Sequence, residues 1–339
     1  MSTETLEAGD ARRLAAPPTT VARLSGWTER HGQFRGVVLI AVTAVVFFVL
    51  FRRIHFPTVL QTLATIPLWA WVTALLLTLS FPVLSALRWH YTLKAIGHHV
   101  PVTRCLKIIL GTSPISAIAP SKAGDLLKAF SLRGEIGVLE VSGTVLAERA
   151  LDVMVLAGLA LFGSTLVGNP LVTRFAVAIV GTGIAGLLLL PLAVSSIKKP
   201  ALREKLERLI RVLGALRAQP AKATAIVLFT VLNWLASIAQ THLLLLAVGA
   251  HPPFWLTTAA LPIAIFIGLI PITIGGMGTR DAALVTLLAS AATAPQALSV
   301  ALLYSFFGYW LLAILGLPFI NSALFGNRDR SPKDRIRCF

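Results

Sequence analysis

Charged residues are scarce in this sequence, and acidic residues are the scarcer kind. Only 13% of its 339 residues are charged, with 14 acids against 30 Lys and Arg, whereas 56% are apolar. Soluble domains carry roughly a quarter charged residues. The shortage excludes an ordinary soluble protein, and several apolar runs approach the length that crosses a bilayer. We predict an all-α, polytopic membrane protein.

The sequence is also poor in the residues that usually carry chemistry. Its two cysteines, Cys105 and Cys338, lie far apart in unlike contexts, which disfavours a disulfide and gives no zinc or haem spacing. His90, His98 and His99 lack metal-ligand spacing, and no Walker loop, nucleophile elbow or metal-binding helix motif is present. We therefore expect no catalytic residue, no metal and no cofactor, and a protein that is not an enzyme.

The net charge of +16 would suggest nucleic acid as the partner of a soluble protein. Here the cations lie beside apolar runs, so we expect the bilayer with its anionic inner leaflet, and no nucleic acid, as the partner. Basic residues fill 196–222 and 321–339, whereas 249–254 has no charge. The positive-inside rule then places both termini in the cytoplasm, in a multi-pass inner-membrane protein. Arg52 and Arg53 are the exception, because this topology puts them at the outer face.

Apolar runs predict about six full spans and two interrupted segments. The segment 1–35 is polar and is not a cleavable signal, so we expect it to be cytoplasmic and partly disordered. The interrupted segments, 105–132 and 255–292, have arms of only ~20 Å, too short for a hydrocarbon core of ~30 Å. The six spans are expected at 36–51, 66–87, 147–166, 175–195, 223–248 and 296–317.

The order of these segments divides the chain into two similar units. Each unit, 36–174 and 175–320, reads span, span, interrupted segment, span, and the basic cytoplasmic tail 321–339 follows. Three full spans per unit reverse the orientation of the second unit, which predicts an inverted repeat with two re-entrant helical hairpins. An amphipathic helix over 196–222 either lies on the inner leaflet or docks a partner protein.

The first interruption places a cation and an acid beside a proline and a glycine. Gly124 permits unusual backbone, and Asp125 is expected to cap the helix that resumes. Lys122 is unfavourable at a helix N-terminus unless an anion occupies the site. Lys128 either completes that site or extends to the cytoplasm.

The second interruption is richer in glycine. Gly275, Gly276 and Gly278 expose backbone N–H groups that can form an anion-binding nest, and Arg280 suits bidentate contact with phosphate. Asp281 either caps the following helix or pairs with Arg280. The plain structural alternative is a glycine turn with a local ion pair.

A third charged cluster lies where the third span begins. Glu148 and Asp152 are four residues apart and share a helix face, and Arg149 precedes Asp152 by three and can pair with it. Charges inside a membrane helix cost ~2.5–3.5 kcal/mol each, so we expect these to face inward, in a substrate site or a structural ion network. The candidate partners of the acids are Lys122, Lys128 and Arg280.

These three clusters together resemble the membrane domain of the lysylphosphatidylglycerol synthase/flippase family. The family pattern is roughly Pro-x-Arg-x-Gly-Glu-x-x-Arg, then Glu-Arg-x-x-Asp, then Pro-x-x-x-Gly-Gly-x-Gly-x-Arg-Glu, and the resemblance spans about 36–320. Arg88 and Trp89 also fit, although with Tyr91 they otherwise indicate anchoring at the membrane interface. The sequence has no large aminoacyl-transferase domain, so it resembles stand-alone members, which are linked to glycolipid and hopanoid export. The chain departs from this family pattern at four positions. In the first motif, the family has Arg, Glu and Arg, and this chain has Lys122, Asp125 and Lys128. In the third motif, the family ends on Glu, and this chain has Asp281.

The resemblance implies a lipid flippase or transporter for an anionic phospholipid or a phosphate-linked (polyprenyl) glycolipid. Lys122, Arg149 and Arg280 would bind the phosphate, and the neighbouring acids would hold these cations in the empty site. The alternatives are a membrane enzyme that modifies a lipid head group and an accessory subunit of a lipid-modifying complex. A homo-oligomer or a lipid-modifying enzyme partner is also compatible with the sequence.

Overall fold

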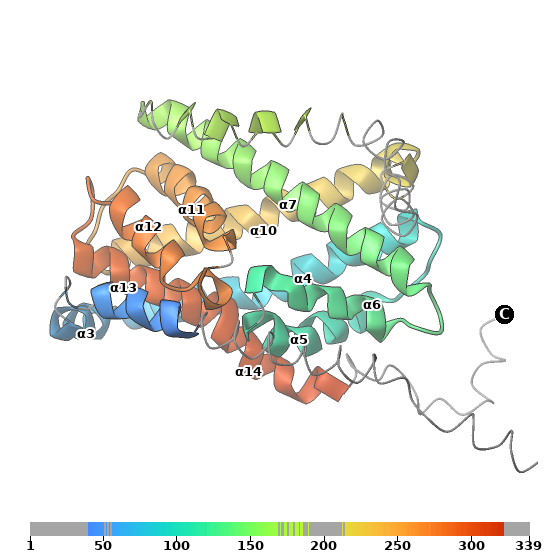
Figure 1. Cartoon of the computed structure of the whole chain (residues 1–339), viewed down its shortest axis with the longest axis horizontal. Coiled ribbons are helices and arrows are strands. Elements are labelled where there is room, and N and C mark those ends of the chain that lie inside the picture. Colours follow the sequence, from blue (N-terminus) through green and yellow to red (C-terminus); the bar gives the residue numbers. More distant parts are fainter. Residues whose placement is uncertain are drawn as a thin grey trace, which may run out of the picture.

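A computed structural model describes residues 40–50, 56–118, 120–168, 214–270 and 272–321, together with scattered single residues between these ranges. Every element in this part of the chain is a helix (Figure 1). The described helices begin with the short apolar helix Ile40–Leu50. They continue with α3 (Phe56–Ala64), α4 (Leu68–Ala95), α5 (Val102–Ile118), η1 (Pro120–Leu127), α6 (Lys128–Ser131), α7 (Val138–Val167), α10 (Pro220–Ala247), α11 (Phe254–Leu269), η2 (Ile274–Gly276), α12 (Thr279–Leu287), α13 (Ala294–Ser305), η3 (Phe306–Leu311), α14 (Leu312–Gly316) and η4 (Leu317–Phe319).

Four helical stretches of the described chain are long and apolar enough to cross a membrane, so the protein is a polytopic membrane protein. They are Leu68–Ala95, Val138–Val167, Pro220–Ala247 and Ala294–Phe319. Each overlaps a predicted span, but α7 begins nine residues earlier than its predicted span, so the charged cluster at 148–152 lies well inside a helix. Most of 175–195, 196–222 and the two chain ends lies outside the described residues, so the predictions made for those segments stay predictions.

Both interrupted segments are broken helices, as the sequence predicts. In the first, α5 gives way to the 3₁₀ helix η1 and the four-residue α6. In the second, α11 ends at Leu269, and η2 and α12 follow. The glycines of this turn adopt positive φ, 59° at Gly275, 72° at Gly276 and 94° at Gly278, which side-chain-bearing residues rarely adopt.

The two breaks lie against each other in the middle of the fold. η1 packs on η2, α5 also contacts η2, and α11 also contacts η1. A Cβ atom added to Gly275 would lie 3.1 Å from the carbonyl oxygen of Ala117, so the two backbones approach closely there. The unwound parts of two segments far apart in sequence therefore form one region.

Two long helices lie beside the interrupted segments, α4 packed on α5 and α10 on α11. α4 and α10 pack along each other in opposite directions, as Figure 1 shows. Gln219 at the start of α10 donates to the carbonyl of Ala95 at the end of α4 (2.7 Å), and Gln240 donates to that of Ala74 (2.7 Å). α7 packs on α11, and α5 packs on α14.

Each interrupted segment starts and finishes at the same end of the molecule. Arg104, in the first turn of α5, pairs with Glu135, which follows α6, through two contacts of 2.7 Å. Gln296, at the start of α13, donates to the carbonyl of Val248 at the end of α10 (2.9 Å). Because α4 and α10 are antiparallel, the segment after α4 and the segment after α10 leave from opposite ends.

Gly276→Ala is expected to destabilise the fold by roughly 2–4 kcal/mol, because a non-glycine residue is strained at positive φ and the new methyl overlaps its neighbour. A Cβ atom at this position would lie 2.5 Å from the carbonyl oxygen of Gly268. Thermal unfolding in detergent measures the effect. Gly158→Ala in α7 is the matched control, since a methyl there meets nothing within 4 Å. Equal melting temperatures for the two variants would contradict this account of the break.

Candidate functional site

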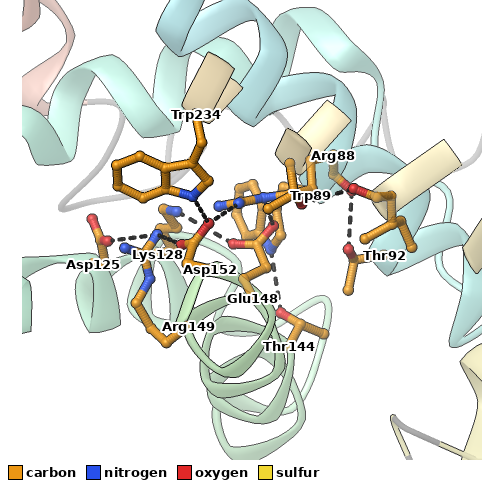
Figure 2. A network of polar contacts seen from close by, with 12 residues as sticks. Arg88, Trp89, Thr92, Asp125, Lys128, Thr144, Glu148, Arg149, Asp152 and Trp234 are labelled. Carbon is orange, nitrogen blue, oxygen red and sulfur yellow. Dashed lines mark hydrogen bonds and ion pairs between the residues drawn. The ribbon is translucent and has the colours of Figure 1, made fainter. Parts of the chain in front are cut away.

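The charged cluster of α7 is the centre of a buried ion network. Glu148 and Asp152 are 1% and 5% exposed, as expected for acids that share an inward helix face. One oxygen of Glu148 lies 3.3 Å from Nε of Arg88, and the other lies 3.6 Å from Nζ of Lys128. Figure 2 shows these side chains converging from α4, α6 and α7.

Asp152 is held more tightly than Glu148. Its Oδ1 atom accepts from Nη1 of Arg88 (2.6 Å) and from the indole N–H of Trp234 on α10 (2.9 Å). Its Oδ2 atom lies 3.2 Å from Nη2 of Arg149. The predicted pairing of Arg149 with Asp152 is therefore confirmed.

Arg149 also connects α7 to the first break. Its Nη2 atom lies 3.3 Å from Oδ2 of Asp125 in η1, whose other oxygen accepts from Ser116 (3.2 Å). The Arg149 side chain is 32% exposed, against 4% for Arg88 and for Lys128. Among these three cations, Arg149 has by far the most exposed side chain.

At the second break, Arg280 is enclosed by its own neighbours. It donates to Oδ1 of Asp281 (3.0 Å) and to Ser305, and its side chain is 2% exposed. Its guanidinium lies 4.7 Å from the ring centroid of Tyr304 and 5.1 Å from that of Tyr309. Tyr309 lies in the π-helical turn η3, which begins two residues after Tyr304, and this wide turn lets residues five apart face one group.

The structure corrects the anion nest predicted at the glycine turn. Oδ2 of Asp281 accepts from the backbone N–H of Gly278 at 3.0 Å. The carboxylate of Asp281 therefore occupies an N–H group at the start of α12 that the predicted nest would offer to an anion. Asp281 thus both caps the helix and pairs with Arg280. Gly275 lines a cavity, whereas Gly276 packs backbone to backbone against Gly268.

Two cavities meet beside these groups. The first is about 160 Å³ and includes Arg88, Asp125 and Lys128 in its lining. The second is about 200 Å³ and includes Gly275 and Arg280. Both are lined by Arg149, Asp152, Trp234 and Tyr309. The two predicted clusters and the glycine turn are therefore brought to one connected site, with Arg149 at its junction.

Some buried polar atoms of this site have no hydrogen-bond partner within the described chain. They are Nε of Arg149, Nη1 of Arg280, Oδ1 of Asn233 and Oε2 of Glu148, the last of which has its ion pair with Lys128. A buried polar atom without a partner is costly, so these atoms leave hydrogen-bonding capacity of the site unused. Two of the four are arginine donors, which suit an anion.

The described charges of the site balance. Each described cation of the site therefore has a carboxylate partner, and Arg149 is the most exposed of them. The cations are Arg88, Lys128, Arg149 and Arg280, and the acids are Asp125, Glu148, Asp152 and Asp281.

Several predictions for the first cluster change. The prediction that Asp125 caps a helix is wrong, because its carboxylate is taken by Ser116 and Arg149, and α6 has no side-chain cap. Lys128 is 3% exposed and stays in the site instead of extending to the cytoplasm. The side chain of Lys122 lies outside the described residues, so its predicted role is open.

The sequence interpretation missed several site residues. Arg88 and Trp89 are 3% and 0% exposed, so the interpretation that they anchor at the membrane interface is wrong. A charge inside the long apolar run of α4 was the available signal for Arg88. Trp234, Asn233 and Tyr309 gave no comparable signal, because polar and aromatic residues are common in such runs.

Comparison with protein families gives one match to this chain. The family described as "Lysylphosphatidylglycerol synthase TM region" matches residues 36–316. No curated protein matches the chain. The match covers most of the chain and includes every residue of the ion network, and this protein therefore belongs to the lysylphosphatidylglycerol synthase membrane-region family.

Proposed function

We propose that this protein is a flippase or transporter that moves an anionic lipid between leaflets and is not an enzyme. The substrate would be an anionic phospholipid or a phosphate-linked (polyprenyl) glycolipid. The observation that carries the proposal is the position of Arg149, a reachable cation at the junction of two cavities beside two broken helices. Broken helices of this kind form the binding sites of many transporters.

Arg149 and Arg280 would bind the lipid phosphate. Both line the second cavity, and each has a buried N–H without a partner. When the phosphate takes Arg149, Asp125 would lose its ion pair, so binding would loosen the contact between η1 and α7. This gives a direct link between anion binding and movement of the first break.

The packing also supports an inverted repeat of two re-entrant hairpins. The first hairpin would be α5 to α6 and the second α11 to α12, entering from opposite ends of the antiparallel pair α4 and α10. α5 and α11 have 17 and 16 residues, about 25 Å each, which is short of a full crossing. The pairs α5 with α14 and α11 with α7 correspond under such a repeat.

Cysteines placed at His251 and Thr293 are expected to label from outside the cell. These exposed positions flank the second hairpin, and the proposed topology puts both termini in the cytoplasm of an inner-membrane protein. A membrane-impermeant maleimide on whole cells measures labelling, in a background where Cys105 and Cys338 are replaced by alanine. Labelling from opposite sides would mean that 255–292 crosses the membrane.

The substrate itself is best identified from the purified protein. Mass spectrometry of lipids that remain bound after detergent extraction is expected to show enrichment of an anionic, phosphate-bearing lipid over the bulk membrane. Arg149→Gln should lose that enrichment, because the exchangeable cation is gone. A bound-lipid profile that matches the bulk membrane in both proteins would contradict the proposed substrate class.

A further inference from the structure

The last span of the described chain contains a π-helical turn beside Arg280. α13 passes into η3, which covers Phe306–Leu311, and the span continues as α14. A π-helical turn holds one residue more than an α-helical turn, and such turns are rare and are frequently found at functional sites. The position of this turn next to a buried cation of the site therefore calls for an explanation.

The π-helical turn allows two tyrosines to hold Arg280 together. Tyr304 lies before the turn and Tyr309 within it, and their ring centroids lie 4.7 and 5.1 Å from the guanidinium. Ser305, also before the turn, accepts a hydrogen bond from the same guanidinium. In an α-helix each residue turns by about 100°, so residues five apart would point about 140° apart. The enclosure of Arg280 therefore depends on the turn staying π-helical.

This enclosure conflicts with the role proposed for Arg280 in binding phosphate. The Arg280 side chain is only 2% exposed, although Arg280 and Tyr309 both line the second cavity. A phosphate can therefore reach the guanidinium only if part of the enclosure moves. Asp281 is held at the start of α12 by the N–H of Gly278, whereas Tyr309 is half-buried and borders both cavities. Tyr309 is thus the part of the enclosure that has space to move into.

The far side of the turn is packed on the first interrupted segment. Gly316, at the end of α14, lies backbone to backbone against α5, because a Cβ atom there would overlap the carbonyl oxygen of Leu110 and lie 2.9 Å from Cδ of Pro114. Pro114 has no N–H, so that carbonyl lacks its usual helical donor, and α5 is weakened at this contact. α5 leads into η1, so a rotation of α14 would displace the first break.

We infer that η3 is a switch, which a phosphate-bearing lipid converts from a π-helical to an α-helical turn. Tyr309 then turns away from Arg280, which opens the guanidinium to the phosphate, and α14 rotates against α5. The lipid drives this change because its phosphate binds Arg280 only in the α-helical state. The inference rests on the proposed function, since the switch links the phosphate site at the second break to movement of the first.

Deletion of Gly308 tests the switch without removing a side chain. Gly308 lies in the middle of the turn, so its deletion leaves the residues before it in register with α13 and those after it in register with α14. The variant is expected to fold with Arg280 still enclosed, because Tyr304 and Tyr309 become four residues apart, close to one α-helical turn. With no extra residue to absorb, it should lose most of the translocation of anionic phospholipid that the wild-type protein shows in proteoliposomes.

Hydrogen–deuterium exchange gives a readout that does not require transport. Dioctanoyl phosphatidic acid at saturating concentration should change the exchange of amides 306–311 in the wild-type protein, since their hydrogen bonds rearrange. The protein without Gly308 should show no such change. Unchanged exchange at 306–311 in the wild-type protein would overturn the inference, and this holds even if the deletion variant fails to fold.

Phe306→Ala is the matched control in the same turn. The Phe306 ring is exposed and lines neither cavity, and the substitution keeps all six residues of η3. Translocation and the exchange response should therefore match those of the wild-type protein. If Phe306→Ala lost both to the same extent as the deletion, side-chain packing and not the π-helical turn would be responsible, and the switch would be refuted.

These measurements separate the switch from the proposed function. A lipid-dependent change of exchange at 306–311, in a protein that moves no lipid, would refute transport and support the switch. Translocation at the wild-type rate by the protein without Gly308 would refute the switch and leave transport intact.

Discussion

Arg88→Met is expected to destabilise the folded protein by about 3–5 kcal/mol, the usual cost of breaking a buried ion pair. Arg88 is 3% exposed and contacts Glu148 at 3.3 Å and Asp152 at 2.6 Å. Methionine fills similar space and removes the charge, so two buried carboxylates are left with only Lys128 and Arg149. Thermal unfolding in detergent measures the loss.

Arg104→Met is the matched control, because it makes the same change in an ion pair near the surface. The Arg104 and Glu135 side chains are 25% and 52% exposed, and such pairs are worth about 1 kcal/mol or less. Asp152→Asn added to Arg88→Met should recover part of the stability, since it removes one stranded charge. Equal melting temperatures for Arg88→Met and Arg104→Met would contradict a structural role for this network.

Substitution of Arg149 is expected to have a second large effect, which is a loss of affinity for the lipid with little change in the stability of the fold. Arg149→Gln should weaken binding of a phosphate-bearing lipid about 10- to 100-fold, because a charged hydrogen bond contributes about 1.5–3 kcal/mol. The fold should persist because Asp125 keeps its hydrogen bond from Ser116 and Asp152 keeps its ion pair with Arg88. Fluorescence titration with a labelled anionic phospholipid in detergent micelles measures the affinity.

The series at this position also tests geometry. Arg149→Lys keeps the charge and loses the planar fork, so its affinity should lie between that of the wild-type protein and that of Arg149→Gln. Arg104→Gln provides the same substitution at a cation outside both cavities and should bind like the wild-type protein. Arg149→Gln with unchanged affinity would remove Arg149 from the site.

The parts of the site that the sequence predicts correctly are those set by local spacing. Arg149 and Asp152 are three residues apart on one helix and do pair. Glycines at 275, 276 and 278 predict a break, and the chain leaves the helix there. Neighbouring residues on a helix or in a turn have few geometric choices, so their contacts can be inferred from the sequence alone.

Contacts between distant helices could not be predicted in this way. Arg88 and Asp152 are 64 residues apart in sequence, and Trp234 is 82 residues from Asp152. The prediction that Asp125 caps a helix failed for the same reason, since Arg149, from another helix, takes its carboxylate. Which of several chemically suitable partners is chosen depends on how the helices pack.

The balance of charges in the site is a further result that the sequence did not reveal. The sequence interpretation predicted that the cations bind a phosphate and that the neighbouring acids pair with these cations only while the site is empty. In the folded protein Arg280 and Lys128 are buried in ion pairs, and Arg149 alone of the four described cations is substantially exposed. Of the three cations that the sequence interpretation assigned to the phosphate, Arg149 is exposed and Arg280 is enclosed, and the side chain of Lys122 lies outside the described residues.

The most direct test of the account is the rate at which purified protein moves a fluorescent anionic phospholipid across proteoliposome membranes. Dithionite quenching of the outer leaflet measures the fraction of lipid exposed over time. Wild-type protein and Arg104→Gln are expected to accelerate translocation equally over protein-free vesicles, and Arg149→Gln is expected to lose most of that acceleration. Translocation by Arg149→Gln at the wild-type rate, or none by the wild-type protein, would contradict a transport site built on Arg149.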